Sequence, residues 1–304
     1  MRSTAAGLLL RVLVLAAPLL VSAPVSAEED RAPPPAFPTT DFAEGAREAS
    51  VSEGGLTARL FYERRPKIDR DLDVPVLQVT AGTRLLLDIA GAASGMDVPA
   101  ASASIAEIDP YRLGKEVYFS SYSGGAHCCT RVIVAEDGPK GWTGIEIGSF
   151  DGDGDYLEDL DHDGVAEIVT TDGAFLYAFD CYACSAAPLV IRAVRDGKVI
   201  DVSAEPRFLK NHRDWLAELE INAEPETRWS SPGFLAGWVA QSVRAGQGPA
   251  AFKALLENWD FAADAGEMTC LSGDDIDACP KRDLKLLKFP DRLKLFLGRH
   301  GYVI

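Results

Sequence analysis

The chain has 304 residues and a formal net charge of −16, with 46 acidic against 30 basic side chains. Such an acidic chain repels nucleic acid and anionic lipid, so we expect neither as a partner. The length is enough for one large domain, or for one domain with an appendage.

Residues 1–27 have the pattern of a secretory signal peptide. Arg2 gives a positive start, an apolar run follows that only Arg11 interrupts, and small residues lead to a cleavage site after Ala27. The run is short for a membrane span of about 20 residues, although an N-terminal anchor is the alternative interpretation. The mature chain, 28–304, has no stretch long and apolar enough to span a membrane. We therefore expect a periplasmic or secreted protein.

The first part of the mature chain predicts a leader followed by a β-rich domain. Residues 28–40 are acidic and then proline-rich, which is typical of a flexible leader. Over 41–204, short apolar or alternating runs are separated by Gly, Asp and Pro, with Asp-Gly hairpin signals and no long helix. The predicted strands are 56–62, 74–80, 83–89, 116–122, 131–135, 142–147, 166–171, 174–179, 188–193 and 198–202. We expect antiparallel sheets in a partial β-propeller-like or sandwich-like arrangement.

Residues 205–304 are predicted to form a helical C-terminal region, which makes the fold class mainly β with C-terminal helices. One apolar stripe has the i, i+3, i+4, i+7 spacing of an amphipathic helix. It consists of Phe252, Leu255, Leu256 and Trp259. Further helices, each with proline near its start, are predicted over 206–221, 232–245 and 290–297.

All six cysteines lie in the mature chain, and an even number in an exported protein predicts disulfides. They are Cys128, Cys129, Cys181, Cys184, Cys270 and Cys279. Cys270 and Cys279 are the simplest pair, because closing their ten-residue loop would stabilise the fold by roughly 2.7 kcal/mol in the chain-entropy model. The connectivity of the others stays open, and cross-pairing would join two β segments. Zinc binding by these four thiols with His127, or a dithiol redox role, is an alternative.

The segment 159–167 has the composition of a loop that binds a hard cation. Its pattern is formed by Asp159, Asp161, Asp163, Gly164 and Glu167. Ca²⁺ takes six to eight oxygen ligands, which closely spaced carboxylates supply, and without a cation the three aspartates would repel one another. An EF-hand does not fit, because its twelfth position needs a bidentate Glu and here holds Thr170. Strand-forming residues follow the loop instead.

The pattern Asp-x-Asp-x-Asp-Gly-x-x-Glu before a strand resembles the calcium loop of the FG-GAP/VCBS repeat family. Those repeats form blades of β-propellers, as in the integrin α-subunit head, and their calcium loops rigidify the blade. The resemblance implies Ca²⁺ ligands from the side chains of Asp159, Asp161, Asp163 and Glu167 and from the backbone carbonyl of Val165. An acidic turn at 151–155 looks like a partial second copy and could supply an extra ligand.

A second resemblance covers more of the chain. Gly-Gly-Ala-His-Cys-Cys at 124–129, the 159–167 loop, Phe-Leu-Tyr-Ala-Phe at 175–179 and the segment 196–201 follow in this order. The order is similar to that in a group of exported bacterial proteins with a Gly-Gly-Ala-His-Cys-Cys motif beside an FG-GAP-like loop. This resemblance implies architecture and compartment, and no particular activity.

Two functions from different classes remain open. In the first, which the sequence favours, calcium and disulfides stabilise a non-catalytic exported scaffold that binds a protein or glycan partner. In the second, the protein is a metal-dependent extracytoplasmic hydrolase whose site combines His127 with Ser123 and an aspartate from 151–163. The chain lacks Gly-x-Ser-x-Gly, His-Glu-x-x-His, a P-loop and a dinucleotide fingerprint.

Overall fold

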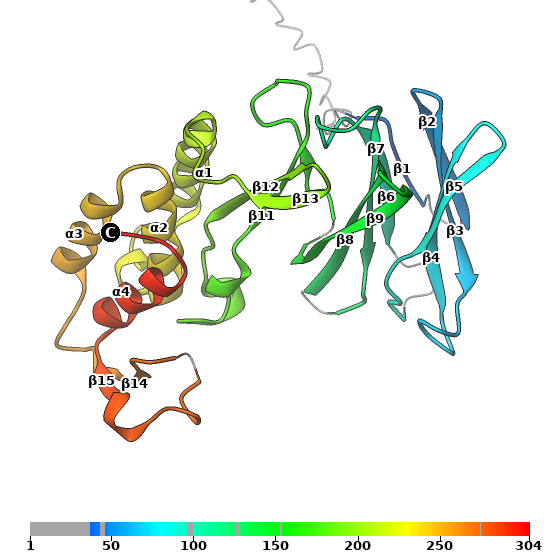
Figure 1. Ribbon diagram of the computed structural model, residues 1–304. Helices are drawn as coiled ribbons and strands as arrows, with labels where there is room; N and C mark the ends of the chain where they lie inside the picture. Colours follow the sequence, from blue (N-terminus) through cyan, green and yellow to red (C-terminus); the bar gives the residue numbers. More distant parts are fainter. Residues whose placement is uncertain (1–36, 43–45, 96–99, 126–127, 153, 274) are drawn as a thin grey trace, which may run out of the picture. The chain divides into compact units, whose positions relative to one another are not determined.

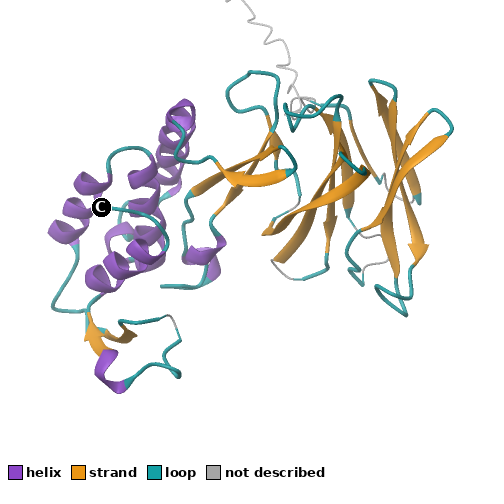
Figure 2. Cartoon of the chain, in the orientation of Figure 1, coloured by secondary structure: helices purple, strands orange, loops and turns teal. Residues whose placement is uncertain are grey.

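Antiparallel strands fill the first part of the described chain and helices follow (Figures 1 and 2). The computed structural model describes residues 37–42, 46–95, 100–125, 128–152, 154–273 and 275–304. These residues belong to one unit, 35–304. The expected signal peptide and most of the expected leader lie outside the described residues. None of the sheets among the described residues closes into a barrel.

Two sheets pack face to face as a β-sandwich. The four-stranded sheet consists of β2 (Glu48–Glu53), β3 (Leu56–Arg64), β4 (Asp73–Ala81) and β5 (Arg84–Ala90) in sequence order. The five-stranded sheet has the order β1 (Thr39–Asp41), β6 (Ala101–Ala106), β7 (Glu116–Tyr122), β8 (Cys128–Gly138) and β9 (Gly141–Asp151). Leu60 and Val79 of the first sheet share a buried core with Phe119 and Ile133 of the second. The mainly β, sandwich-like expectation is therefore confirmed.

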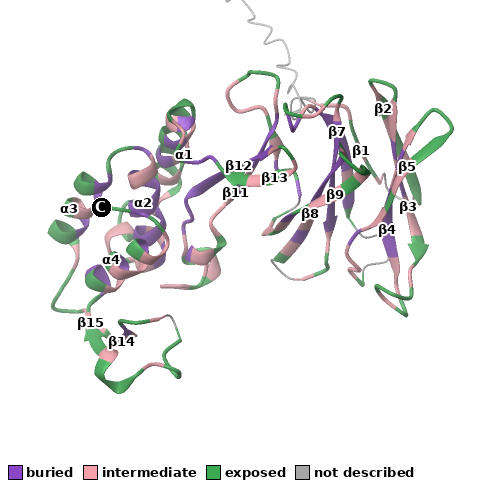
Figure 3. Cartoon of the chain, viewed as in Figure 1, coloured by how far each residue is buried: buried purple, intermediate pink, exposed green. Residues whose placement is uncertain are grey.

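The inner strands of the five-stranded sheet are buried on both faces, as the purple colour of β7 indicates (Figure 3). Successive side chains of a strand point to opposite faces. Phe119 and Ile133 accordingly enter the sandwich core, whereas Tyr118, Val132 and Val134 enter a second core on the other face. A strand covered on both sides needs a continuous apolar run, which explains the sequence Val-Ile-Val-Ala in β8.

A third sheet supplies the other side of this second core. It contains β10 (Leu157–Glu158), β11 (Glu167–Thr171), β12 (Leu189–Arg195) and β13 (Lys198–Asp201) in sequence order. Ile168 and Val194 of this sheet contact the same core as Tyr118. The segment between β10 and β11 is the predicted cation loop, and a strand follows it, as expected.

The helices form a further core with the turn that follows β11. They are α1 (Leu209–Asn222), α2 (Pro232–Arg244), α3 (Gly248–Asn258) and α4 (Phe289–Arg299), with a hairpin of β14 (Glu267–Cys270) and β15 (Leu284–Leu287) between α3 and α4. Proline lies in the first turn of α2, α3 and α4, where its missing N–H costs no helical bond. Leu235, Leu255 and Leu297 pack around Phe175. Among the described residues, no helix has the length and apolar character that a membrane crossing requires.

Two expectations about elements are wrong. Residues 174–179 do not form a strand, because Asp172 caps a short 3-10 turn, Gly173–Phe175, by accepting a hydrogen bond from the Ala174 amide at 3.1 Å. Phe175 then packs with the helices. The expected leader, 28–40, also extends too far, since Thr39 and Thr40 already pair with β6.

Buried acids join the sandwich to the third sheet. Glu116, 1% exposed, accepts hydrogen bonds from the amides of Ile108 and Asp109 through one carboxylate oxygen, at 2.8 and 3.1 Å. Asp109, itself fully buried, accepts the amides of Asp196 and Gly197 in the β12–β13 turn at 3.0 and 2.7 Å. Burial raises the pKa of Glu116 to about 7, although the two amides oppose that shift.

This buried carboxyl group predicts a specific pH dependence of stability. The folded state holds the Glu116 proton more tightly than the unfolded chain, so the free energy of unfolding falls as pH rises from 4.5 to about 7. The decrease from this group is on the order of 3 kcal/mol. Glu116→Gln keeps an oxygen that accepts both amides and does not titrate, so its urea-unfolding free energy should lack this decrease. The same substitution at exposed Glu218 is the control, and parallel profiles for wild type and Glu116→Gln would contradict the assignment.

Candidate metal centre

The 159–167 loop is folded by its own aspartates. The Asp159 carboxylate accepts the amides of Asp163 and Gly164 at 3.1 and 3.0 Å, and the Asp163 carboxylate accepts the amide of Val165 at 2.8 Å. His162 and Gly164 have φ angles of 61° and 90°. The left-handed conformation at Gly164 is one that glycine adopts without steric cost, as the sequence predicts.

The loop brings three of the predicted ligands together. Carboxylate oxygens of Asp159, Asp161 and Glu167 all lie within 4.8 Å of one another. Glu167 is 1% exposed, and it accepts the Leu160 amide at 3.2 Å. Burial raises the pKa of Glu167 to about 7, because a carboxylate removed from water needs compensating positive charge or hydrogen bonds. The cluster therefore has the chemistry of a cation site.

Arg207 supplies part of this positive charge. Its guanidinium lies 2.7 Å from Asp161, 3.3 Å from Asp163, 3.2 Å from Glu167 and 3.0 Å from Glu205. Arg207 belongs to the 3-10 turn Pro206–Phe208 that leads into α1, and its guanidinium lies over the Phe208 ring at 4.3 Å. The sequence did not predict this residue, because no spacing rule relates it to a loop some forty positions earlier.

One oxygen of the cluster has no partner in the part of the chain that the structure describes. Asp161 Oδ1 is buried and accepts no hydrogen bond there, whereas Asp161 Oδ2 pairs with Arg207. A buried carboxylate oxygen without a partner is costly. Oxygen donors from carboxylates are the ligands that Ca²⁺ prefers, so the residues present fit a hard cation.

The remaining predicted ligands lie at the edge of this cluster. Asp163 is not within the 4.8 Å group and joins it through the shared contact with Arg207. Val165 borders a cavity of about 270 Å³ that Asp163, Glu167 and Arg207 also line. The acidic turn at 151–155 is not part of the group in the described chain. Its Asp151 instead accepts a hydrogen bond from the Tyr182 hydroxyl.

The other candidate centre, around His127, lies outside the described residues, so the hydrolase alternative stays a prediction. Its neighbour Ser123 is described, and its hydroxyl donates to the Cys129 carbonyl at 2.8 Å and accepts the Cys129 amide at 3.0 Å. These bonds join the end of β7 to the start of β8. They show Ser123 in a local structural contact.

Each close pair of cysteines forms its own disulfide. Cys128 is bonded to Cys129 and Cys181 to Cys184, so these bonds do not join two β segments. The described residues contain no free cysteine, and the four sulfur atoms are not available as zinc thiolates. Asp180 lies close to the Cys181–Cys184 pair. That group of three therefore does not have the free thiols of a metal site.

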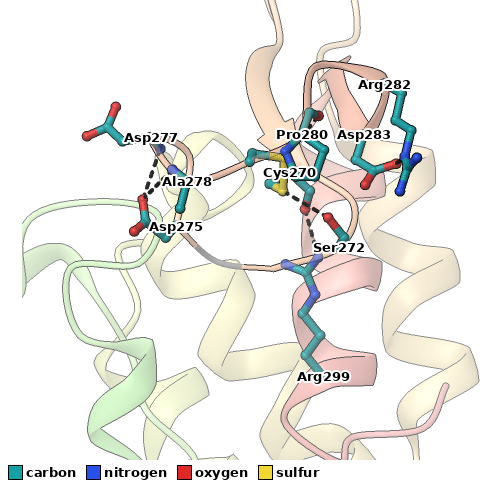
Figure 4. Close-up of a disulfide and its surroundings, with 10 residues drawn as sticks. Cys270, Ser272, Asp275, Asp277, Ala278, Pro280, Arg282, Asp283 and Arg299 are labelled. Atoms are coloured by element: carbon teal, nitrogen blue, oxygen red, sulfur yellow. Dashed lines mark hydrogen bonds and ion pairs between the residues drawn. A yellow bond between two sulfur atoms is a disulfide. The ribbon is translucent and has the colours of Figure 1, made fainter.

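The third disulfide joins Cys270 to Cys279, with Cα atoms 5.7 Å apart, which confirms the expected pair. Figure 4 shows the loop that it closes. The Asp275 carboxylate accepts the amides of Asp277 and Ala278 at 2.9 and 3.2 Å. Arg299 of α4 donates to the Cys270 carbonyl at 2.7 Å. The disulfide thus fixes the β14–β15 hairpin, and α4 holds its base.

A protein-family model matches the helical part of the chain. Residues 212–301, from within α1 to just past α4, match the family described as the sll0997 C-terminal domain. The chain is 33% identical over 257 residues to the probable thylakoid lumen protein sll0997 of Synechocystis sp., covering 83% of this chain and 75% of that protein. The chain belongs to this family.

A second relative is described as the uncharacterized protein y4bJ of Sinorhizobium fredii. The two chains are 31% identical over 271 residues, which is 88% of this chain and 42% of that protein. The relative is therefore much longer than the region it shares with this chain. No solved structure matches the chain.

The positive φ angle of Gly164 in this loop can be tested by substitution. A Cβ atom at Gly164 would meet no atom within 4 Å, so the cost of Gly164→Ala comes from its φ of +90° alone. We expect the substitution to lower the free energy of unfolding by about 1–2 kcal/mol. Gly173→Ala is the matched control, because that site is equally open and its φ is not positive. Equal melting temperatures for the two variants in a thermal scan would contradict this loop geometry.

Proposed function

We propose that the protein is an extracytoplasmic, disulfide-stabilised calcium-binding protein that acts as a non-catalytic scaffold. The signal-peptide pattern at 1–27 and the three disulfides support an oxidising compartment outside the cytoplasm, the periplasm or the exterior. The relative described as a probable thylakoid lumen protein supports the same assignment.

The observation that carries the calcium proposal is the unpartnered oxygen of Asp161. Oδ1 is buried, accepts no hydrogen bond from the described residues, and belongs to a carboxylate close to those of Asp159 and Glu167. A cation bound by these carboxylates would remove the cost of the unpartnered atom. Asp163 and the Val165 carbonyl are the further ligands that we propose. Calcium suits the site better than magnesium, because Ca²⁺ accepts flexible, many-oxygen coordination and Mg²⁺ keeps much of its water.

The place of the loop in the sheet supports an FG-GAP/VCBS-like role. The loop joins β10 to β11, which pair antiparallel within a four-stranded sheet, the strand number of one propeller blade. Glu167 is at once a proposed ligand and the first residue of β11. A bound ion would therefore fix the start of a buried strand, and we infer a structural role for it.

Arg207 would share the loop carboxylates with the ion. Four carboxylates face its positive charge, and Arg195 pairs with one of them, Glu205, at 2.8 Å. The cluster therefore keeps an excess of negative charge even with both guanidinium groups in place. The helical region begins with this residue's turn. Calcium binding and the attachment of the helices are therefore expected to support each other through Asp161, Asp163 and Glu167.

Thermal unfolding across a calcium titration tests the proposal. An ion that binds only the folded state stabilises it by about 2.7 kcal/mol at a hundredfold excess over Kd. We expect a saturable rise in Tm with Ca²⁺, a much smaller one with Mg²⁺, and reversal by EDTA. Asp161→Asn should lose the rise, because one ligand charge is removed.

The control for this experiment is Asp137→Asn, which removes one charge from an exposed position in β8. It should keep the calcium response of the wild type. The calcium proposal is wrong if wild-type Tm does not change with Ca²⁺. It is also wrong if Asp161→Asn responds as strongly as the wild type does.

A further inference from the structure

A second cavity lies apart from the cation loop, at the ends of β9 and β11. Its volume is about 400 Å³, within the range of about 300–1,000 Å³ that small-ligand sites occupy. None of its lining residues belongs to the 159–167 loop. The residues that the argument uses are Asp151, Asp172, Tyr177, Tyr182 and Arg192, with Cys128 of the Cys128–Cys129 disulfide also in the lining.

Two tyrosine rings form the apolar part of this cavity. The rings of Tyr177 and Tyr182 lie 5.6 Å apart, tilted by 42°. Tyr177 is 62% exposed, and its φ of 65° is in the left-handed region, which is unfavourable for a bulky side chain. Core packing does not account for an aromatic ring that is mostly in solvent. Strained residues of this kind gather at binding sites, and a ligand contact accounts for both observations.

Two carboxylates form the acidic part. Asp151 accepts a hydrogen bond from the Tyr182 hydroxyl, which fixes that ring beside the cavity. Asp172 accepts the Tyr302 hydroxyl at 3.0 Å and caps the Gly173–Phe175 turn. Both carboxylates are therefore held in place by neighbouring groups, as preorganised binding groups need to be.

Arg192 of β12 forms the basic part. Its guanidinium donates to the Thr170 hydroxyl at 2.7 Å and lies 4.8 Å from the centre of the Phe150 ring. Within the described chain, Arg192 makes no ion pair at 4.0 Å or less. A guanidinium has five N–H donors in a planar fork, so most of them are not used by these contacts.

The combination of groups selects one class of ligand. A simple anion would meet two carboxylates, and a simple cation would meet Arg192. Sugar hydroxyls both donate to carboxylates and accept from a guanidinium, while the C–H face of a sugar ring packs on an aromatic ring. We propose that this cavity binds a saccharide, with Tyr177 and Tyr182 against the ring face and Asp151, Asp172 and Arg192 bonded to hydroxyls.

This site goes beyond the calcium proposal and does not need it. The lining residues come from the ends of β8, β9 and β11, from the middle of β12 and from the segment after β11. The loop that we assign to calcium contributes none. Failure of the calcium titration would therefore leave the saccharide site standing. Failure of the saccharide test would likewise leave the calcium proposal standing.

The test is saturation-transfer difference NMR on the full chain with a fixed panel of soluble disaccharides. The panel contains neutral hexose, N-acetylhexosamine and uronic acid members at millimolar concentration. We expect saturable binding of at least one member. Tyr177→Ala should weaken that binding about tenfold or more, because the stacking ring is lost. Tyr182→Phe keeps the ring and should weaken it less.

Tyr111→Ala is the matched control, because Tyr111 is 67% exposed and does not line this cavity. It should bind as the wild type does, and so should Asp161→Asn. Each variant is first shown to melt within the range of the wild type, so that a loss of binding is not a loss of fold. The saccharide proposal is overturned if no panel member binds, or if Tyr111→Ala and Tyr177→Ala weaken binding equally.

Discussion

An excess of negative charge around one guanidinium is the constraint on which the rest of the structure depends. Arg207 pairs with Asp161, Asp163 and Glu167 of the cation loop and with Glu205 of its own turn. Arg195 also pairs with Glu205, at 2.8 Å, but two guanidinium groups do not balance four carboxylates. Burial of Glu167 makes the imbalance more costly. A divalent ion bound by these carboxylate oxygens would supply the missing positive charge. The proposed calcium site follows from charge and burial as much as from the loop pattern.

The same contacts link the two kinds of secondary structure. The last residue of the loop, Glu167, is the first residue of β11. The next residue, Ile168, lies in the core shared with the five-stranded sheet. Arg207 begins the helical region, and Asn211 of α1 donates to the loop carbonyl of Leu160 at 3.4 Å. The cation loop therefore lies where the sheets meet the helices. The charge balance of the loop therefore affects the stability of both the sheets and the helices. The cavity that we propose for a saccharide lies at the opposite end of β11.

Sequence patterns predicted what depends on local order. The continuous apolar run of β8 was readable because a strand buried on both faces is apolar throughout. The stripe of α3 was readable because burial of one helix face imposes a period of 3.6, and the loop aspartates were readable because their spacing is short. The strand predicted over 174–179 is wrong, because the apolar side chains of this segment pack with helices that come later in the chain. Arg207 and Arg192 could not be predicted. Their roles depend on tertiary contacts with segments distant in sequence, which no single-sequence period encodes.

The most direct test of the calcium site is a crystal structure of the full chain grown with Ca²⁺, with anomalous diffraction to locate the ion. We expect an anomalous peak within bonding distance of carboxylate oxygens of Asp159, Asp161 and Glu167, with Asp161 Oδ1 among the ligands. The absence of a peak there in a crystal saturated with Ca²⁺ would contradict the proposed calcium site.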